Sequence, residues 1–123
     1  MQRYAPEESN AWKAGAGGYK SSITDFARFG AGMLNRKLIN EATEQQMWTL
    51  QTTTSGSPAE YGLGFAVSTQ GPARVFHHGH QEETDTQLIL YTQSRHGIVA
   101  MCNCGHGDSV KLIQAASAVL YRR

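Results

Sequence analysis

The chain has 123 residues, which is the usual size of one domain and enough to bury a hydrophobic core. Its formal net charge is +1 and its Lys and Arg residues form no dense stripe, so bulk charge gives no reason to expect nucleic acid or a membrane surface as partner. No apolar run is long enough to span a bilayer, and the first residues lack the form of a signal peptide. We therefore expect a soluble protein, and the sequence does not indicate its cellular compartment.

Residues 1–18 are polar and end in a glycine-rich run, which predicts an irregular lead-in. Ser22 and Asp25 then have the spacing of a capping box, in which Ser22 accepts from the Asp25 amide and the Asp25 carboxylate reaches back to the Ser22 amide. We therefore expect a helix here, with Arg36 and Lys37 just past its end complementing the helix dipole. Its predicted buried face consists of Ile23, Phe26, Phe29, Gly30, Met33 and Leu34.

A second helix is predicted over residues 41–50, with Asn40 as its N-cap. The tract rich in Thr, Ser and Gly that follows, up to Pro58, predicts a flexible loop. Beyond it, apolar residues alternate with small ones, which predicts a strand with one buried face. The alternating residues are Tyr61, Leu63, Phe65 and Val67.

Three short apolar runs separated by turn-prone segments, at residues 73–80, 87–91 and 97–103, predict an antiparallel meander. Asp108 or Ser109 is the expected cap of a last helix that lies across the sheet. This order favours an α+β fold in which helices flank an antiparallel sheet. We expect a single domain over 1–123, with a helical part at 19–51 and the sheet and last helix at 60–121.

Two stretches together resemble a known family. Residues 16–29 contain Ala-Gly-Gly, then Ser-Ser, then Asp-Phe-Ala-Arg-Phe, and this pattern is similar to the Ala-Gly-Gly-x-x-Ser-Thr-x-x-Asp-Leu-Ala-Arg-Phe stretch of serine β-lactamase-like hydrolases. The segments 61–65, 78–79 and 97–103 follow in the order and at roughly the spacing of that family's C-terminal half. The family includes class C β-lactamases, penicillin-binding DD-carboxypeptidases and related esterases.

The resemblance implies a C-terminal portion of the β-lactamase/transpeptidase-like fold and acyl transfer at a serine. In the family a Ser-x-x-Lys motif supplies nucleophile and base, a Tyr-x-Asn motif assists proton transfer, and a Lys- or His-x-Gly strand walls the pocket. Only the third motif has a counterpart, because no serine of this chain has a lysine three residues on. Tyr19-Lys20-Ser21 mimics the second motif but lies inside the Ala-Gly-Gly segment, where the family has no catalytic tyrosine. We therefore expect a C-terminal segment that is inactive alone and that self-associates or binds an N-terminal partner segment.

The resemblance places the pocket wall at His78, Gly79, His80 and Gln81. In the register that fits both flanking segments, His78 takes the place of the family's Lys or His, and His80 falls where the family has a second glycine, so that its imidazole would obstruct the substrate. Shifting the frame by one makes His77-His78-Gly79 the motif and restores the glycine. The register favours His78, and strand alternation then sets His77 on the opposite face.

Other interpretations of these residues stay open. Histidines at a strand end can be partly exposed residues that blunt a sheet edge, which is the favoured interpretation for His77. A non-catalytic binding or assembly module on the same scaffold is the competing function. For a complete enzyme the partner would be a small-molecule or peptide acyl substrate (a β-lactam, a D-alanyl peptide or an ester), and no cofactor is expected.

A metal site built from the histidines, Cys102, Cys104 and His106 is the weaker hypothesis. With the family's sheet order, one strand separates the histidine strand from the strand of Cys102. The resulting spacing of about 9–10 Å is too large for side chains of both strands to share one ion bound at about 2 Å. A strand that continued through both cysteines would point them the same way, which is poor geometry for a mutual disulfide. Cys102 is therefore interpreted as a small buried hydrophobe.

The run 97–103 is apolar on both faces, as expected for a covered strand. Because it comes last in the meander, it would leave an unpaired apolar edge, which is prone to pair with another chain. Arg95 and His96 are expected in the preceding hairpin turn, with Arg95 as a solvated charge.

Overall fold

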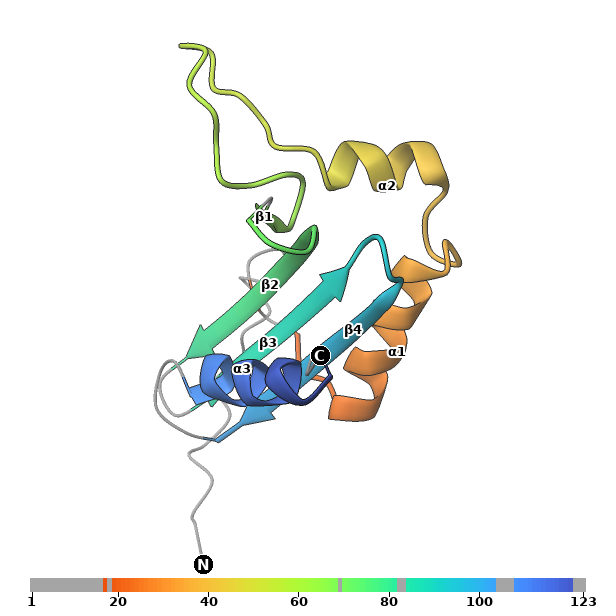
Figure 1. Cartoon of the computed structure of the whole chain (residues 1–123), viewed down its shortest axis with the longest axis vertical. Coiled ribbons are helices and arrows are strands. Elements are labelled where there is room, and N and C mark those ends of the chain that lie inside the picture. Colours follow the sequence, from red (N-terminus) through yellow and green to blue (C-terminus); the bar gives the residue numbers. More distant parts are fainter. Residues whose placement is uncertain (1–16, 18, 69, 82–83, 104–107, 121–123) are drawn as a thin grey trace, which may run out of the picture.

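The computed structural model describes residues 17, 19–68, 70–81, 84–103 and 108–120, with only the backbone for His78, His80 and Gln81. These residues form three helices and a four-stranded sheet, which confirms the α+β prediction (Figure 1). In chain order the elements are α1 (Ile23–Leu34), α2 (Glu41–Met47), β1 (Ala66–Ser68), β2 (Arg74–Gln81), β3 (Thr84–Tyr91), β4 (His96–Cys102) and α3 (Asp108–Leu120). None of the helices described is long and apolar enough to cross a membrane.

The sheet is an antiparallel meander in the order β1-β2-β3-β4, as predicted. Each strand pairs with its neighbour in sequence, and β3 is buried along most of its length. Asp85 of β3 pairs with His80 of β2 on one side and with Cys102 of β4 on the other. The expected separation of the histidine strand from the Cys102 strand by one strand is therefore confirmed.

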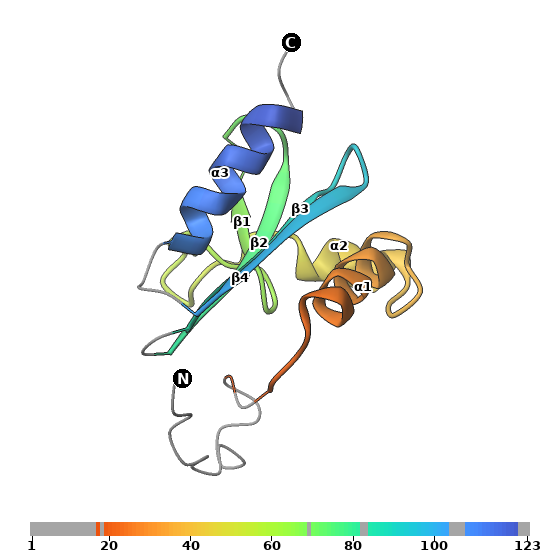
Figure 2. The ribbon, with the colours of Figure 1, turned by 90° about the horizontal axis from the view of Figure 1, so that it is seen from below.

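Both faces of the sheet are covered, because successive side chains of β3 point to opposite sides. Leu88 and Leu90 pack in the cluster beneath α1 and α2, while Ile89 and Tyr91 pack in the cluster beneath α3. Figure 2 shows α3 on one side of the sheet and α1 with α2 on the other. The chain thus builds two small cores that share one central strand.

One of the two hydrogen bonds of the predicted capping box is present at the start of α1. Ser22 Oγ accepts from the Asp25 amide at 3.1 Å, which satisfies one of the free N–H groups of the first turn. The carboxylate of Asp25 does not reach the Ser22 amide. It accepts instead from the Ser22 hydroxyl at 2.8 Å and from Arg28 at 2.8 Å.

The predicted buried face of α1 is only partly correct. Gly30, Met33 and Leu34 are buried, but Ile23 and Phe29 are 53% and 41% exposed. The helix meets the sheet through its second half, where a Cβ on Gly30 would lie 3.0 Å from Leu88 Cδ1. Glycine at this position allows the close approach, and the first turn consequently diverges from the core.

Asn40 caps α2 as predicted, accepting from the Thr43 amide at 2.9 Å. The predicted strand over 61–67 is wrong, because β1 begins only at Ala66. The Leu63 amide donates to the Met47 carbonyl at 2.9 Å, and Gly64 has a φ of +79°. The left-handed glycine turns the chain where the alternating pattern suggested an extended strand.

The expected caps of α3, Asp108 and Ser109, both lie within the helix. The capping carboxylate comes from the sheet, since the Ser109 amide donates to Asp85 Oδ2 at 3.0 Å. Asp85 and Ser109 are 3% and 1% exposed. A side-chain oxygen that accepts from a free N–H of the first turn stabilises the start of a helix, so Asp85 ties the start of α3 to β3.

Asp85→Ala should therefore lower the free energy of unfolding by about 2 kcal/mol, measured by urea denaturation followed by circular dichroism. The matched control is Asp25→Ala, which removes an exposed carboxylate from the first turn of α1 and should cost less than about 1 kcal/mol. Equal losses would contradict a special role for the buried cap.

The interpretation of Cys102 as a small buried hydrophobe is wrong, because Cys102 is disulfide-bonded and only half-buried. The prediction assumed a strand running through both cysteines, whereas β4 ends at Cys102. Strand alternation therefore places no restriction on Cys104, the only other cysteine of the sequence, which lies outside the described residues.

Candidate functional site

The four predicted site residues lie in the second half of β2, where it pairs with β3. Their register partners are Gln87 for His78, Thr86 for Gly79, Asp85 for His80 and Thr84 for Gln81. The structure thus brings the backbones of the predicted residues together on one strand. Since the side chains of His78, His80 and Gln81 lie outside the description, their assignment to a pocket stays a prediction.

His77 has an exposed side chain on the α1 face of the sheet. Its ring contacts Phe65 edge to face, with 6.3 Å between the ring centroids, and Phe65 belongs to the cluster beneath α1 and α2. Because residues two apart share a face of a strand, position 79 lies on this same face. His77 and Gly79 are therefore neighbours on one side of β2.

Gly79 lies directly against a hydroxyl group of β3. A Cβ at this position would come 2.9 Å from Thr86 Oγ1, and that hydroxyl donates to the Gly79 carbonyl at 3.3 Å. A side chain at position 79 could be accommodated only by displacing Thr86. The contact with Thr86 thus accounts for a glycine at position 79 by packing within the sheet.

The α3 face of the same sheet end carries two buried polar side chains that the sequence patterns did not identify. Asp85 caps α3, and Gln87 is 8% exposed with no hydrogen-bond partner for its Oε1 atom. They alternate along β3 with residues of the opposite cluster, so they face away from Thr86. A buried carboxylate and a buried free acceptor therefore lie behind the proposed wall.

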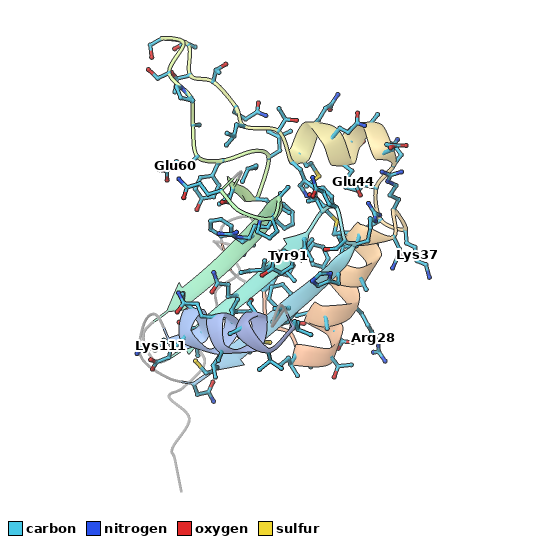
Figure 3. The ribbon with its side chains drawn as sticks, in the orientation of Figure 1. Arg28, Lys37, Glu44, Glu60, Tyr91 and Lys111 are labelled. Atoms are coloured by element: carbon cyan, nitrogen blue, oxygen red, sulfur yellow. The ribbon has the colours of Figure 1, made fainter. Side chains whose placement is uncertain are left out.

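A cluster of charged residues lies at the opposite end of the sheet, around Glu44 of α2. The Glu44 side chain is 6% exposed and binds Arg36 at 3.2 Å and Arg95 at 3.3 Å, and Arg36 also contacts Glu41 at 2.9 Å. Figure 3 shows Glu44 on the lower side of α2, toward the sheet. The hydrogen bond to Glu44 raises the pKa of Arg36 above its usual value.

This cluster corrects two expectations. Arg95 does lie in the hairpin turn and its side chain is 35% exposed, but it is not only a solvated charge, because its guanidinium binds a buried carboxylate. Arg36 contacts α2 rather than complementing the end of α1. The turn that carries Arg95 follows Tyr91, at the end of β3 remote from Thr86, so the cluster lies far from Gly79 along the strand.

A groove of about 370 Å³ lies between α1 and the strands β3 and β4. Its walls are mainly apolar, and none of its lining residues belongs to β2, so it is distinct from the predicted pocket wall. Helix α1 contributes Ile23, Ala27 and Ala31 to its walls, and β4 contributes Gly97 and Val99.

No group of three or more His, Cys, Asp or Glu side chains able to hold a metal ion occurs in the part of the chain that the structure describes. Of the predicted ligand candidates, the side chains of His78 and His80 and residues 104–107 fall outside that part. Cys102 is disulfide-bonded and so offers no thiolate, which removes one of the ligands that the metal hypothesis needs.

The family model described as Beta-lactamase matches residues 1–121, which is nearly the whole chain. A search of curated proteins gives no match.

Proposed function

Because the chain belongs to the β-lactamase family, we propose that strand β2 forms one wall of an acyl-transfer pocket whose serine nucleophile comes from outside these 123 residues. The family match supports a β-lactamase-like serine hydrolase scaffold. The sequence contains no Ser-x-x-Lys motif, so neither the attacking oxygen nor its base is among the residues described above. The wall would act on the acyl group through hydrogen bonds, without forming a covalent bond to it.

The observation that carries this proposal is the edge position of this part of β2: residues 77–81 pair with β3 but, among the residues described, with no strand on their other side. A strand position without a side chain lets an acyl group approach the backbone, whose N–H groups can then donate to the carbonyl oxygen. When serine Oγ adds to the carbonyl carbon, that oxygen becomes an anion, and the N–H donor stabilises it. A neighbouring imidazole on the wall would assist proton transfer to the leaving group.

The proposed substrate class follows from the need for a carbonyl oxygen that can accept a hydrogen bond from the wall. A β-lactam, a D-alanyl peptide and an ester all present an electrophilic carbonyl to a serine, and all three are compatible with the wall. We propose a small acyl substrate of this kind. The part of the pocket opposite β2 would determine which of the three the enzyme accepts.

Mixing the chain with a polypeptide that carries Ser-x-x-Lys and Tyr-x-Asn from a member of the family should restore covalent labelling by a fluorescent penicillin. The label should map to the serine of the added polypeptide, because one pocket wall cannot replace a nucleophile in a covalent mechanism. The chain by itself should form no adduct. A stoichiometric mass increase on any serine of the chain alone would overturn the proposal.

The same mixture identifies the wall imidazole through His77→Ala and His78→Ala. Adjacent strand residues face opposite ways, so only one of the two variants should lose activity, by roughly 10²- to 10⁴-fold. The sequence register assigns that role to His78, whereas the shared face of His77 and Gly79 assigns it to His77. Comparable losses from both variants would show that β2 is not the wall.

A further inference from the structure

The backbone groups of β2 point alternately toward β3 and toward the opposite side of the strand. In an antiparallel pair, the N–H and C=O of one residue both point to the facing strand, and those of the next residue both point away. The Thr92 amide donates to the Ala73 carbonyl at 3.1 Å, so the groups of Ala73 point toward β3. Val67, which faces Val75 from β1, donates away from β2 to the Glu60 carbonyl at 3.0 Å. The groups of Val75 therefore also point to β3.

This alternation places the two ends of one peptide group of the wall on opposite sides of β2. Gly79 lies four residues after Val75, so its C=O points to β3, whereas the N–H of His80 points to the other side. These two groups belong to the same planar peptide group. Among the residues described, no strand pairs with residues 77–81 on the side of that N–H. The His80 N–H is therefore the donor that this peptide group offers to an approaching carbonyl.

Thr86 holds the other end of this peptide group. It lies half-buried on β3 directly opposite Gly79, and its hydroxyl donates to the Gly79 carbonyl at 3.3 Å. Glycine leaves the space for this hydroxyl, because a Cβ at position 79 would lie 2.9 Å from Thr86 Oγ1. A hydrogen bond accepted by a C=O restrains the peptide plane and polarises the N–H of the same group. Thr86 can thus act on the His80 N–H from the opposite side of the strand.

We propose that Thr86 is a positioning residue of the wall, whose hydroxyl orients and polarises the Gly79–His80 peptide so that the His80 N–H donates to the oxyanion of the acyl substrate. This role rests on the acyl-transfer function proposed for β2. Thr86 itself neither touches the substrate nor exchanges a proton with it. At 3.3 Å its bond is long for a hydroxyl donor, so its loss should cost about tenfold in rate, less than the 10²- to 10³-fold of a lost oxyanion donor.

Thr86→Val replaces the hydroxyl by a methyl group of similar size. In the mixture with the polypeptide that supplies the serine, this variant should be labelled by the fluorescent penicillin about tenfold more slowly at saturation. The penicillin concentration that gives half the maximal rate should change little, because the oxyanion exists only after attack. Thr86→Ser keeps the hydroxyl and should recover most of the rate.

Thr92→Val is the matched control. The Thr92 hydroxyl donates to the Ala73 carbonyl at 3.2 Å, which is the same kind of contact at the far end of the same strand pair. Its loss should leave the labelling rate as in the unaltered chain. A tenfold loss in both valine variants would overturn the proposal, because it would reflect a general weakening of the sheet.

Two measurements on the chain alone test the geometry without acyl transfer. Hydrogen exchange should be faster at the His80 amide than at the Gly79 amide, which points into the sheet. The carbonyl carbon resonance of Gly79 should move upfield in Thr86→Val and stay near its original position in Thr86→Ser. A His80 amide as protected as that of Gly79, or a Gly79 resonance that does not move, would overturn the role of Thr86.

The labelling experiment separates this role from the function on which it rests. Equal labelling rates for Thr86→Val and the unaltered chain would overturn the role of Thr86 and leave the acyl-transfer function standing. No labelling of the mixture that contains the unaltered chain would overturn the acyl-transfer function, and the role of Thr86 with it.

Discussion

Replacing Glu44 by alanine should lower the free energy of unfolding by about 3 kcal/mol, the low end of the range for breaking a buried ion pair. The Glu44 carboxylate is almost completely buried, and it binds the guanidinium groups of Arg36 and Arg95. Its removal leaves two cations without their shared anion. The side chains of Arg36 and Arg95 are 39% and 35% exposed, so water solvates the two cations and offsets part of this loss.

Glu41→Ala is the matched control, because Glu41 also binds Arg36 but its side chain is 59% exposed. Exposed ion pairs contribute little, so this variant should lose less than about 1 kcal/mol. Urea denaturation followed by circular dichroism measures both values on the same chain. Losses of similar size would mean that burial of the Glu44 carboxylate contributes nothing to the interaction.

Gly62→Ala should be comparably damaging, at about 3 kcal/mol, the upper end of the usual cost of overpacking. A Cβ at Gly62 would collide with the carbonyl oxygen of Met47 and would lie 3.0 Å from that of Thr49. Both obstacles are backbone atoms, so no side chain can rotate away to make room. The segment after α2 must move, and the hydrogen bond from Leu63 to Met47 should be lost.

Gly56→Ala is the control that separates this steric collision from the cost of a left-handed backbone conformation for alanine. Gly56 has a φ of +83° but nothing within 4 Å of a Cβ, so alanine there meets only the cost of the left-handed conformation, about 1–2 kcal/mol. Thermal denaturation of the two variants should rank Gly62→Ala as clearly less stable. The opposite ranking would show that the contact with Met47 can relax.

The features that sequence predicted correctly are those decided by neighbouring residues or by strand pattern. Ser22 and Asn40 cap their helices because the capping oxygen and its amide are three residues apart in the chain. The meander follows from apolar runs joined by short turns. The positions of His78 and Gly79 on one strand follow from the same pattern.

The features that sequence failed to predict depend on contacts between distant parts of the chain. Arg36 and Arg95 have φ values of 55° and 56°, in a region that favours glycine, and each places its guanidinium on Glu44. No local pattern marks Glu44 as their partner. The shortened first strand likewise reflects the packing of Gly62 on a helix end, which alternation cannot reveal.

The connection between the sheet and the helical layer has a consequence for the order of folding. The strands pair with sequence neighbours, whereas Glu44 and Arg95 are separated by 51 positions. Closing a loop of that length costs about 3.5 kcal/mol in chain entropy beyond a constant. The strand hairpins can therefore form before α2 docks, and we expect the interaction of Glu44 with Arg95 to form after the rate-limiting barrier. Contacts formed that late slow unfolding and leave the folding rate nearly unchanged, so we expect Glu44 to prolong the lifetime of the native state.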